Sequence, residues 1–214
     1  MALDPATVRG SYDRIARQYA EEFDGELAHR PLERALLGAL PEQAGLDVSP
    51  GIVADLGAGP GHVARYLRGA AVPTVGIDLA PAMAAEAHHR NRVPSAAGSL
   101  TALPLADGSL AAAVVFYAVI HLDDDGLADA AGEMARVLRP GGVALVSIHI
   151  GDEVRHVDDW HGEPVDLDFR FLQPGTLRRV LAEAGLAVEA ILEREPIPDV
   201  EAQTRRAYLL ARRR

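Results

Sequence analysis

Hydrophobic positions in this chain fall into short apolar runs that alternate with segments of helical spacing. Apolar runs at 52–56, 74–78 and 112–117 are each followed by a stretch in which apolar residues recur every three or four positions. The run 112–117 is apolar at consecutive positions, which is typical of a strand buried on both faces of a sheet. Strands that alternate with helices predict an α/β fold with a doubly wound, mostly parallel sheet.

The two ends of the chain extend this pattern. Asp4 and Pro5 are typical of a helix N-cap and a first helical residue, and the helix that follows places Tyr12 and Tyr19 on one apolar face. A second helix is expected to begin at Pro31. The other elements that we expect are helices at 62–68, 81–90, 123–138 and 174–184, a turn at 139–142, a long loop at 150–173, and strands at 95–97, 143–150, 186–194 and 204–211, the last two as an antiparallel pair.

A glycine-rich turn follows the first expected strand. Gly57, Gly59 and Gly61 give the pattern G-x-G-x-G, whereas the dinucleotide fingerprint would need a glycine in place of His62. Glycines let the backbone turn sharply and let a ligand approach it closely. Asp78 ends the second strand at the same edge of the sheet, where a carboxylate can accept hydrogen bonds from both hydroxyls of a ribose. The turn therefore predicts a nucleoside-binding site.

The charge around this turn separates two classes of cofactor. Asp55 comes shortly before the first glycine and adds a negative charge, which would repel a pyrophosphate and attract a cation. S-adenosylmethionine carries a sulfonium and an ammonium group and has no phosphate. The pattern therefore favours S-adenosylmethionine over NAD or FAD.

Four segments, in this order and spacing, resemble the motifs of the class I S-adenosylmethionine-dependent methyltransferases. V-A-D-L-G-A-G-P-G (53–61) resembles their first motif, and V-G-I-D-L-A-P (75–81) resembles their acidic second motif. Residues 98–110 are similar to the segment before their fourth strand, and residues 136–146 to their helix, turn and fifth strand. The closest resemblance is to the small-molecule, or type 11, branch. It implies a Rossmann-like sheet of seven strands, the last of them inserted antiparallel.

The resemblance also implies roles for single residues. S-Y-D-R-I-A-R-Q-Y (11–19) resembles an N-terminal helix that covers the cofactor, although it is equally an amphipathic helix with two half-buried tyrosines. Met83 would pack on the adenine or on the helix core. Ser99 stands where the family commonly has an aspartate that binds the adenine amino group, and it can accept one uncharged hydrogen bond. The residues that we expect to bind the cofactor are Tyr12, Tyr19, Asp55, Gly57, Ala58, Gly59, Gly61, Asp78, Leu79, Met83, Ser99, Leu100 and Tyr117.

The candidate catalytic residues are Tyr117, His121 and His149. Tyr117 to His121 follow the fourth strand, where the family places residues nearest the transferable methyl group, and His149 ends the fifth strand at the same edge. A histidine titrates near neutral pH, so His121 is a candidate general base or substrate ligand. The alternative is that His121 only packs against or caps the next helix.

The segment 150–173 is expected to cover the substrate, because binding loops lie at strand ends. Trp160 would provide a stacking surface there. His156 and His161 are flanked by acids, but their spacing matches no known zinc or facial-triad motif, and we expect no metal.

Composition limits the classes of protein that remain. We expect one domain over residues 1–214, with a helical lid at 1–45, a cofactor-binding core at 50–150 and the substrate loop at 150–173. The net charge of −10 argues against binding to nucleic acid or anionic membrane. The chain has no cysteine and no long apolar run, and no secretory signal is recognisable. We therefore expect a cytoplasmic protein, monomeric or homodimeric.

The function that these features predict is methyl transfer from S-adenosylmethionine to a small-molecule acceptor by in-line displacement. Two alternatives remain. The first is a cofactor-binding module without catalysis, and the second is an NAD-dependent oxidoreductase, which His62, Asp55 and the antiparallel end strand disfavour.

Overall fold

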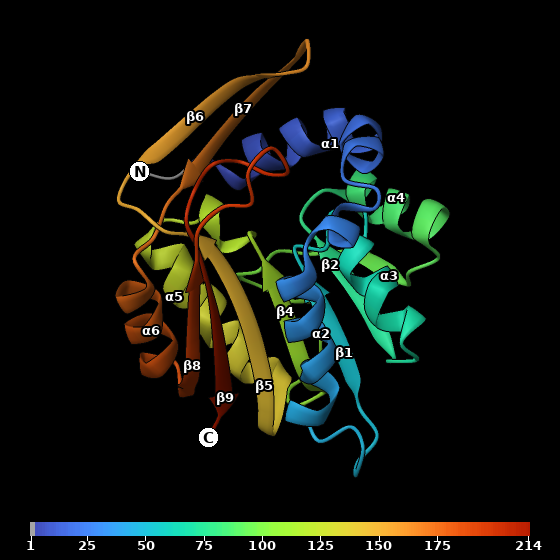
Figure 1. Cartoon of the computed structure of the whole chain (residues 1–214), viewed down its shortest axis with the longest axis vertical. Coiled ribbons are helices and arrows are strands. Elements are labelled where there is room, and N and C mark those ends of the chain that lie inside the picture. Colours follow the sequence, from blue (N-terminus) through green and yellow to red (C-terminus); the bar gives the residue numbers. More distant parts are fainter. Residues whose placement is uncertain (1–2) are drawn as a thin grey trace.

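The computed structural model describes residues 3–214 and contains one seven-stranded sheet with helices on both faces (Figure 1). The strand order is β3-β2-β1-β4-β5-β9-β8. β9 pairs antiparallel with both β5 and β8, while β3, β2, β1, β4 and β5 pair parallel with one another. This confirms the predicted fold class and the antiparallel insertion of the last strand. The strands are β1 (Ile52–Leu56), β2 (Thr74–Asp78), β3 (Ser95–Ala97), β4 (Leu110–Phe116), β5 (Leu138–His149), β8 (Leu186–Arg194) and β9 (Arg206–Arg213).

The helices cover the sheet because successive residues of β4 face opposite sides. Ala113 and Val115 pack into a core that includes α5 and α6, whereas Ala112 and Val114 pack into a core that includes α2 and α3. Asp4 caps the first helix as predicted, by accepting a hydrogen bond from the amide of Ala6. The helices are α1 (Pro5–Glu22), η1 (Glu26–His29), α2 (Pro31–Gln43), α3 (His62–Gly69), α4 (Pro81–Asn91), η2 (Val119–His121), α5 (Asp124–Val137) and α6 (Pro174–Glu183).

The prediction of one long loop at 150–173 is wrong. The segment contains two antiparallel strands, β6 (Val154–Trp160) and β7 (Glu163–Arg170), which form a hairpin separate from the main sheet. The buried side chains of Val165 and Leu167 in β7 pack against α1, and charged residues occupy the positions between them. The alternation is therefore genuine, but it becomes a strand only because α1 supplies a surface on which to bury it.

Two boundaries of the central strands also differ from the prediction. β4 begins at Leu110, two residues before the expected start, and β5 begins at Leu138, so that the expected turn at 139–142 lies within the first part of this strand. Gly141 has a φ of +77°, and the register of β4 against β5 shifts between Leu110 and Ala112. The first part of β5 is therefore irregular: its turn residues are included in a strand that already pairs with β4 at Leu138.

The parallel strands all end at one edge of the sheet, and α1 and the hairpin lie over this edge (Figure 1). Ser11 of α1 and Asp166 of β7 exchange two hydrogen bonds, of 2.9 and 3.2 Å. Asp13 accepts a hydrogen bond of 2.8 Å from the amide of Ala82, at the start of α4. The N-terminal helix is therefore held over the ends of the strands from two sides. No helix within residues 3–214 has the length and apolar character needed to cross a membrane.

Candidate active site

A cavity of about 1450 Å³ lies between the carboxyl ends of the strands and the cover formed by α1 and the hairpin. Pockets for one small ligand usually measure roughly 300–1,000 Å³. The volume is therefore sufficient for a cofactor and a second molecule together. The predicted site residues that line it are Tyr12, Tyr19, Asp55, Gly57, Ala58, Gly59, Asp78, Leu79, Met83, Ser99, Leu100, Tyr117, His121 and His149.

Gly61 is the predicted site residue that does not line the cavity. Its φ of +81° and its position at the N-cap of α3 explain the glycine in conformational terms. A Cβ atom at this position would lie 2.8 Å from Cβ of Ala87 in α4. The glycine therefore lets α3 pack against α4, and the structure does not support a direct contact with the cofactor.

The glycine turn is held in place by Asp78. The amide of Gly59 donates a hydrogen bond of 2.7 Å to Oδ2 of Asp78, and the amide of Ala80 donates one of 2.9 Å to Oδ1. Burial raises the pKa of Asp78 to about 6, although these two amides oppose the rise. Each carboxylate oxygen can accept a second hydrogen bond. Asp78 can therefore both fix the turn and bind two hydroxyl groups in the cavity.

Asp55 lies deeper than the sequence suggested. It belongs to β1 and is buried, and its Oδ2 accepts a hydrogen bond of 3.0 Å from the amide of Ala64 in the first turn of α3. Burial raises the pKa of Asp55 to about 7. Asp55 also satisfies a free amide at the N-terminus of α3.

Ser99, in the place of the expected acid, bonds within its own turn. Its Oγ lies 2.8 Å from Oγ1 of Thr101 and accepts a hydrogen bond of 3.2 Å from the Thr101 amide. Leu100, the next residue, and Met83 also line the cavity, and Met83 packs on α1. This end of the cavity is mostly apolar with a few hydroxyl groups, as a purine ring requires.

Aromatic rings from α1 and the residue after it face the cavity. The Tyr19 ring centroid lies 4.2 Å from that of Phe23, 5.6 Å from that of Trp160 on the hairpin and 5.9 Å from that of Tyr12. Burial raises the pKa values of Tyr12 and Tyr19, so both phenols stay protonated. These rings exclude water from the region above Gly59 and Asp78, and their faces can attract a cation.

His121 connects three parts of the site. Its Nδ1 lies 2.8 Å from the backbone carbonyl oxygen of Asp168 in β7, and its Nε2 lies 2.8 Å from the hydroxyl oxygen of Tyr12 in α1. A carbonyl oxygen only accepts, so Nδ1 carries the proton and Nε2 accepts from Tyr12. Burial lowers the pKa of His121 to about 4. The neutral imidazole therefore keeps its only lone pair at Nε2, next to the cavity.

Tyr117 and His149 lie together beyond His121. Tyr117 has a φ of +54°, which is uncommon for a residue with a side chain. Its ring is stacked on that of His149 with centroids 4.8 Å apart, and His149 is stacked on Phe171 at 5.3 Å. Nδ1 of His149 lies 2.7 Å from the hydroxyl oxygen Oγ1 of Thr204. Burial lowers the pKa of His149 to about 4, with Arg206 and Arg30 as further causes.

The sequence analysis missed a buried group of charged residues beside these rings. Glu201 pairs with Arg30, Arg194 and Arg206, and Glu33 pairs with Arg194. Glu33 also accepts a hydrogen bond from Tyr208, whose hydroxyl oxygen lies 2.9 Å from that of Tyr117. The one available sign of this group in the sequence was that Arg206 and Tyr208 share a face of the strand expected at 204–211. Its partners come from other segments, so the pairing could not be read from local sequence.

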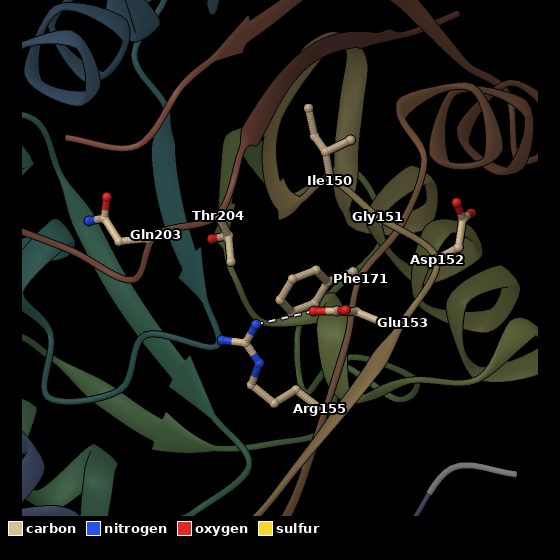
Figure 2. Close-up of a pocket in the computed structure, with 8 residues that line it drawn as sticks. All are labelled: Ile150, Gly151, Asp152, Glu153, Arg155, Phe171, Gln203 and Thr204. Carbon is tan, nitrogen blue, oxygen red and sulfur yellow. Dashed lines mark hydrogen bonds and ion pairs between the residues drawn. The ribbon is translucent and has the colours of Figure 1, made fainter. Parts of the chain in front are cut away.

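A second pocket, of about 520 Å³, lies at the base of the hairpin (Figure 2). Arg155, Phe171, Gln203 and Thr204 line both this pocket and the large cavity. In Figure 2 the guanidinium group of Arg155 lies beside the Phe171 ring, 5.2 Å from its centroid, and pairs with Glu153 at 3.1 Å. The two pockets are therefore neighbours, and His149, which is stacked on Phe171, lines the large cavity.

The histidines of the hairpin do not come together. His156 pairs with Asp168 at 2.9 Å, and His161 pairs with Glu22 of α1 at 3.3 Å, whereas His149 faces the cavity. Within residues 3–214 there is no group of three or more histidine, aspartate or glutamate side chains placed to hold a metal ion. In this hairpin the two histidines take part in surface ion pairs.

Known proteins show the same combination of sequence and fold. A family model described as a methyltransferase domain matches residues 53–142. The malonyl-[acyl-carrier protein] O-methyltransferase of Pseudescherichia vulneris is 30% identical over 183 residues, which are 84% of this chain and 69% of that protein. The demethylmenaquinone methyltransferase of Beutenbergia cavernae is 34% identical over 149 residues, 67% of this chain and 58% of that protein. The chain belongs to the S-adenosylmethionine-dependent methyltransferase family.

The structure of a 1,6-didemethyltoxoflavin-N1-methyltransferase from Burkholderia thailandensis has the same fold. It superimposes with a TM-score of 0.74 at 21% identity and covers 100% of this chain and 92% of that one. The chain spans about half the length of several curated methyltransferases that it matches, between 47% and 58%. The family's cofactor is S-adenosylmethionine, and the cavity suits it: Asp78 can accept hydrogen bonds from a ribose, and the rings of Tyr12 and Tyr19, which can attract a cation, line the same cavity.

We expect cofactor binding by this methyltransferase to weaken in acid. Ribose hydroxyls donate to an ionised carboxylate, and the pKa of Asp78 is about 6. Affinity for S-adenosylhomocysteine should therefore be full above pH 7 and fall as the pH drops through 6, to about one tenth at pH 5. Calorimetry at pH 7 and pH 5 measures this change. Asp55 titrates in the same range, so Asp78→Asn serves as the control, and a pH dependence that persists in this variant would contradict the assignment to Asp78.

Proposed function

We propose that this protein transfers a methyl group from S-adenosylmethionine to a small-molecule acceptor by in-line displacement. The observation that carries the proposal is a single cavity that contains the glycine turn, Asp78, the rings of α1 and the candidate catalytic residues. Its volume has room for two molecules side by side, which a methyl transfer needs and a cofactor-binding module does not.

The residues at the cofactor end would act by orientation. Asp78 would bind the ribose, Ser99 and Leu100 would bind the adenine edge, and Met83 would pack on its face. Gly57, Ala58 and Gly59 line the cavity, and the absence of a side chain at Gly59 leaves the space between the turn and the Tyr19 ring open. This arrangement would place the sulfonium end of the cofactor below Tyr12 and Tyr19, towards Tyr117.

When bound, S-adenosylmethionine supplies a methyl group that its own sulfonium already activates. The task of the protein is then to exclude water and align the acceptor. Tyr12, Tyr19 and Trp160 form the water-excluding cover, and their rings can stabilise the positive sulfonium. Leu79 lies at the same end and contributes apolar surface.

His121 and Tyr12 would manage the proton of an acceptor that must lose one. Tyr12 donates its hydroxyl hydrogen to Nε2 of His121. A proton leaving the acceptor can pass to the Tyr12 oxygen while the Tyr12 proton passes to Nε2, so that the charge ends on the imidazole. With a pKa of about 4, His121 is a weak base, and such a relay suits an acidic acceptor.

The proposed roles of these residues also assign a function to each part of the chain. Residues 1–45 would form the lid, 50–150 the cofactor-binding core and 150–173 the cover of the acceptor, within one domain.

The two curated relatives named above are methyltransferases of demethylmenaquinone and of malonyl-[acyl-carrier protein], and a small-molecule acceptor is our proposal for this chain. We further propose that it acts in the cytoplasm as a monomer or homodimer, in keeping with a chain without cysteine.

Calorimetry followed by a turnover assay tests the proposed function. S-adenosylmethionine and S-adenosylhomocysteine should both bind at micromolar concentration, and NADH should not. S-adenosylhomocysteine should then form from S-adenosylmethionine faster in the presence of candidate acceptors than in their absence. Binding without any acceptor-dependent product would favour a non-catalytic module, and binding of NADH alone would favour an oxidoreductase.

Tyr12→Phe should loosen the cover while keeping an aromatic ring at this position of the cofactor site. The substitution removes the hydrogen bond from α1 to His121, and a single buried hydrogen bond contributes about 0.5–1.5 kcal/mol. Release of S-adenosylhomocysteine should become about 2- to 12-fold faster, with little change in its association. Stopped-flow fluorescence of Trp160, whose ring centroid lies 5.6 Å from that of Tyr19, follows this step.

Tyr66→Phe is the matched control for the lid experiment. The Tyr66 hydroxyl also donates to a protein acceptor, the carbonyl oxygen of Arg34 at 3.3 Å, but Tyr66 does not line the cavity. Its release rate should equal that of the parent protein. An equal acceleration in both variants would show that the effect is not specific to the link between Tyr12 and His121.

A further inference from the structure

The end of the cavity beyond Tyr117 is built from two buried guanidinium groups. Arg30 immediately precedes α2, and Arg206 is the first residue of β9, yet both lie against the carboxylate of Glu201. Arg206 Nη1 is 2.9 Å from Oε1 of Glu201, and Arg30 Nε is 3.5 Å from Oε2. The two side chains are 9% and 2% exposed for Arg30 and Arg206, and both line the cavity.

The two guanidinium groups offer only donors to the cavity that they line. Nε of Arg206 is buried and makes no hydrogen bond in the protein, and Nε of Arg30 has only the 3.5 Å contact with Glu201. Both Nε atoms are closed to solvent, so a ligand would meet the other parts of these side chains, which line the cavity. A group that binds against them must supply acceptor oxygens, and charge favours an anionic one.

The charges around the rings of Tyr117 and His149 also favour a negatively charged ligand. Arg206 and Arg30 lower the pKa of His149, and both oppose the rise that burial causes in the pKa of Tyr117. Glu33 and Glu201 act in the opposite direction at these two rings, but more weakly than the guanidinium groups. The local field at Tyr117 and His149 therefore favours a negative charge.

The nearby carboxylates are already committed to protein partners. Glu201 accepts from Arg194, Arg206 and the amide of Ile197, and Oε1 of Glu33 accepts from Arg194 and Tyr208. Oε2 of Glu33 is buried without a donor and is closed to solvent. The charged groups that this part of the cavity wall presents to a ligand are therefore the two guanidinium groups of Arg30 and Arg206.

We propose that the acceptor molecule carries an oxyanion, a carboxylate or an acidic phenol, and that Arg30 and Arg206 bind it beside Tyr117 and His149. This proposal rests on the proposed function, because it assigns the acceptor half of the same cavity. It narrows the substrate class to organic acids. It also agrees with the weak basicity of the relay through His121, since an acid reaches the site already ionised or nearly so.

Matched pairs of acids and amides test the proposal. The probes are benzoate and benzamide, 1-naphthoate and 1-naphthamide, and octanoate and octanamide, each titrated by ligand-observed NMR into protein saturated with S-adenosylhomocysteine. The acid of at least one pair should bind about tenfold or more tightly than its amide, because a hydrogen bond between charged groups exceeds a neutral one by about this factor. If no acid binds more tightly than its amide, the proposal is wrong.

Variants locate the preference. Arg30→Gln should weaken binding of the preferred acid by about 10- to 100-fold while its amide and S-adenosylhomocysteine bind as before. Arg139→Gln is the matched control, because Arg139 also donates to backbone carbonyls, of Ala44 and Pro50 at 2.9 and 3.1 Å, but does not line the cavity. Unchanged acid binding in Arg30→Gln would overturn the assignment.

The two proposals fail in different ways. Removing Arg206 alone leaves Glu201 with fewer partners, so Arg206→Met is combined with Glu201→Gln, whose amide oxygen can still accept from Arg30 and Arg194. Loss of acid preference with S-adenosylhomocysteine binding retained in this variant supports the inference. If the parent protein does not bind S-adenosylhomocysteine, the proposed function fails. If it binds the cofactor but shows no acid preference, only the inference about the acceptor fails.

Discussion

Asp78→Ala is expected to weaken binding of S-adenosylhomocysteine by about a hundredfold or more. The carboxylate can accept from two ribose hydroxyls, and each hydrogen bond to a charged group contributes about 1.5–3 kcal/mol. The substitution also removes the bonds from the amides of Gly59 and Ala80, of 2.7 and 2.9 Å, which hold the glycine turn. The two losses act on the same site, and calorimetry at pH 7.5 measures their sum.

Two controls separate binding from folding in this experiment. Asp47→Ala removes an exposed carboxylate away from the cavity and should leave the affinity unchanged. Asp78→Asn keeps the shape of the side chain and one acceptor oxygen, so its loss should fall between those of the parent and of Asp78→Ala. An Asp78→Ala protein that unfolds at the parent temperature and binds S-adenosylhomocysteine as tightly as the parent would remove Asp78 from the cofactor site.

Gly57→Ala is expected to lower the free energy of unfolding by about 2–5 kcal/mol. The φ of +73° at this position costs a residue with a side chain about 1–2 kcal/mol. The added Cβ would also lie 2.2 Å from Cβ of Ala118, immediately after Tyr117, and such overpacking costs about a further 1–3 kcal/mol. Relief of the contact would move either the turn or the segment that carries Tyr117, so cofactor binding should weaken as well. Urea denaturation measures the change in stability.

Gly141→Ala is the matched control for the collision at Gly57. Gly141 has nearly the same backbone conformation, with a φ of +77°, and nothing lies within 4 Å of an added Cβ. It should therefore lose only the conformational part, about 1–2 kcal/mol, and keep its affinity for S-adenosylhomocysteine. Equal losses at the two glycines would show that the contact with Ala118 relaxes freely, and that the turn does not require glycine for space.

The positions of the glycine turn and of Asp78 were largely predictable from the sequence, because they depend on local features. The turn at Gly57 and Gly59 follows directly from a strand, and Asp78 ends the next strand along the chain. Parallel neighbouring strands bring these ends together without any further information. The roles assigned within the turn were less secure, since Gly61 serves the contact between α3 and α4, and Asp55 ties β1 to α3.

The hairpin was not predictable in the same way. The alternation of Val165 and Leu167 with charged residues is short, and acidic residues interrupt it on both sides. It forms β7 because Val8 and Ile15 of α1 cover its apolar face, and these residues lie far away in the sequence. A short two-stranded hairpin is only marginally stable by itself, so its formation depends on tertiary contacts.

The sequence by itself determined the sheet, the position of its glycine turn and the class of cofactor, because periodicity, turn chemistry and motif spacing act over a few residues or between neighbouring strands. Only the tertiary structure decided what lies opposite the cofactor. Arg30, Glu201 and Arg206 come from the start of a helix, a loop and the last strand, and their burial became tolerable only when the fold brought opposite charges together. Desolvation then set the pKa values of His121 and His149, which the sequence alone would have left near neutrality.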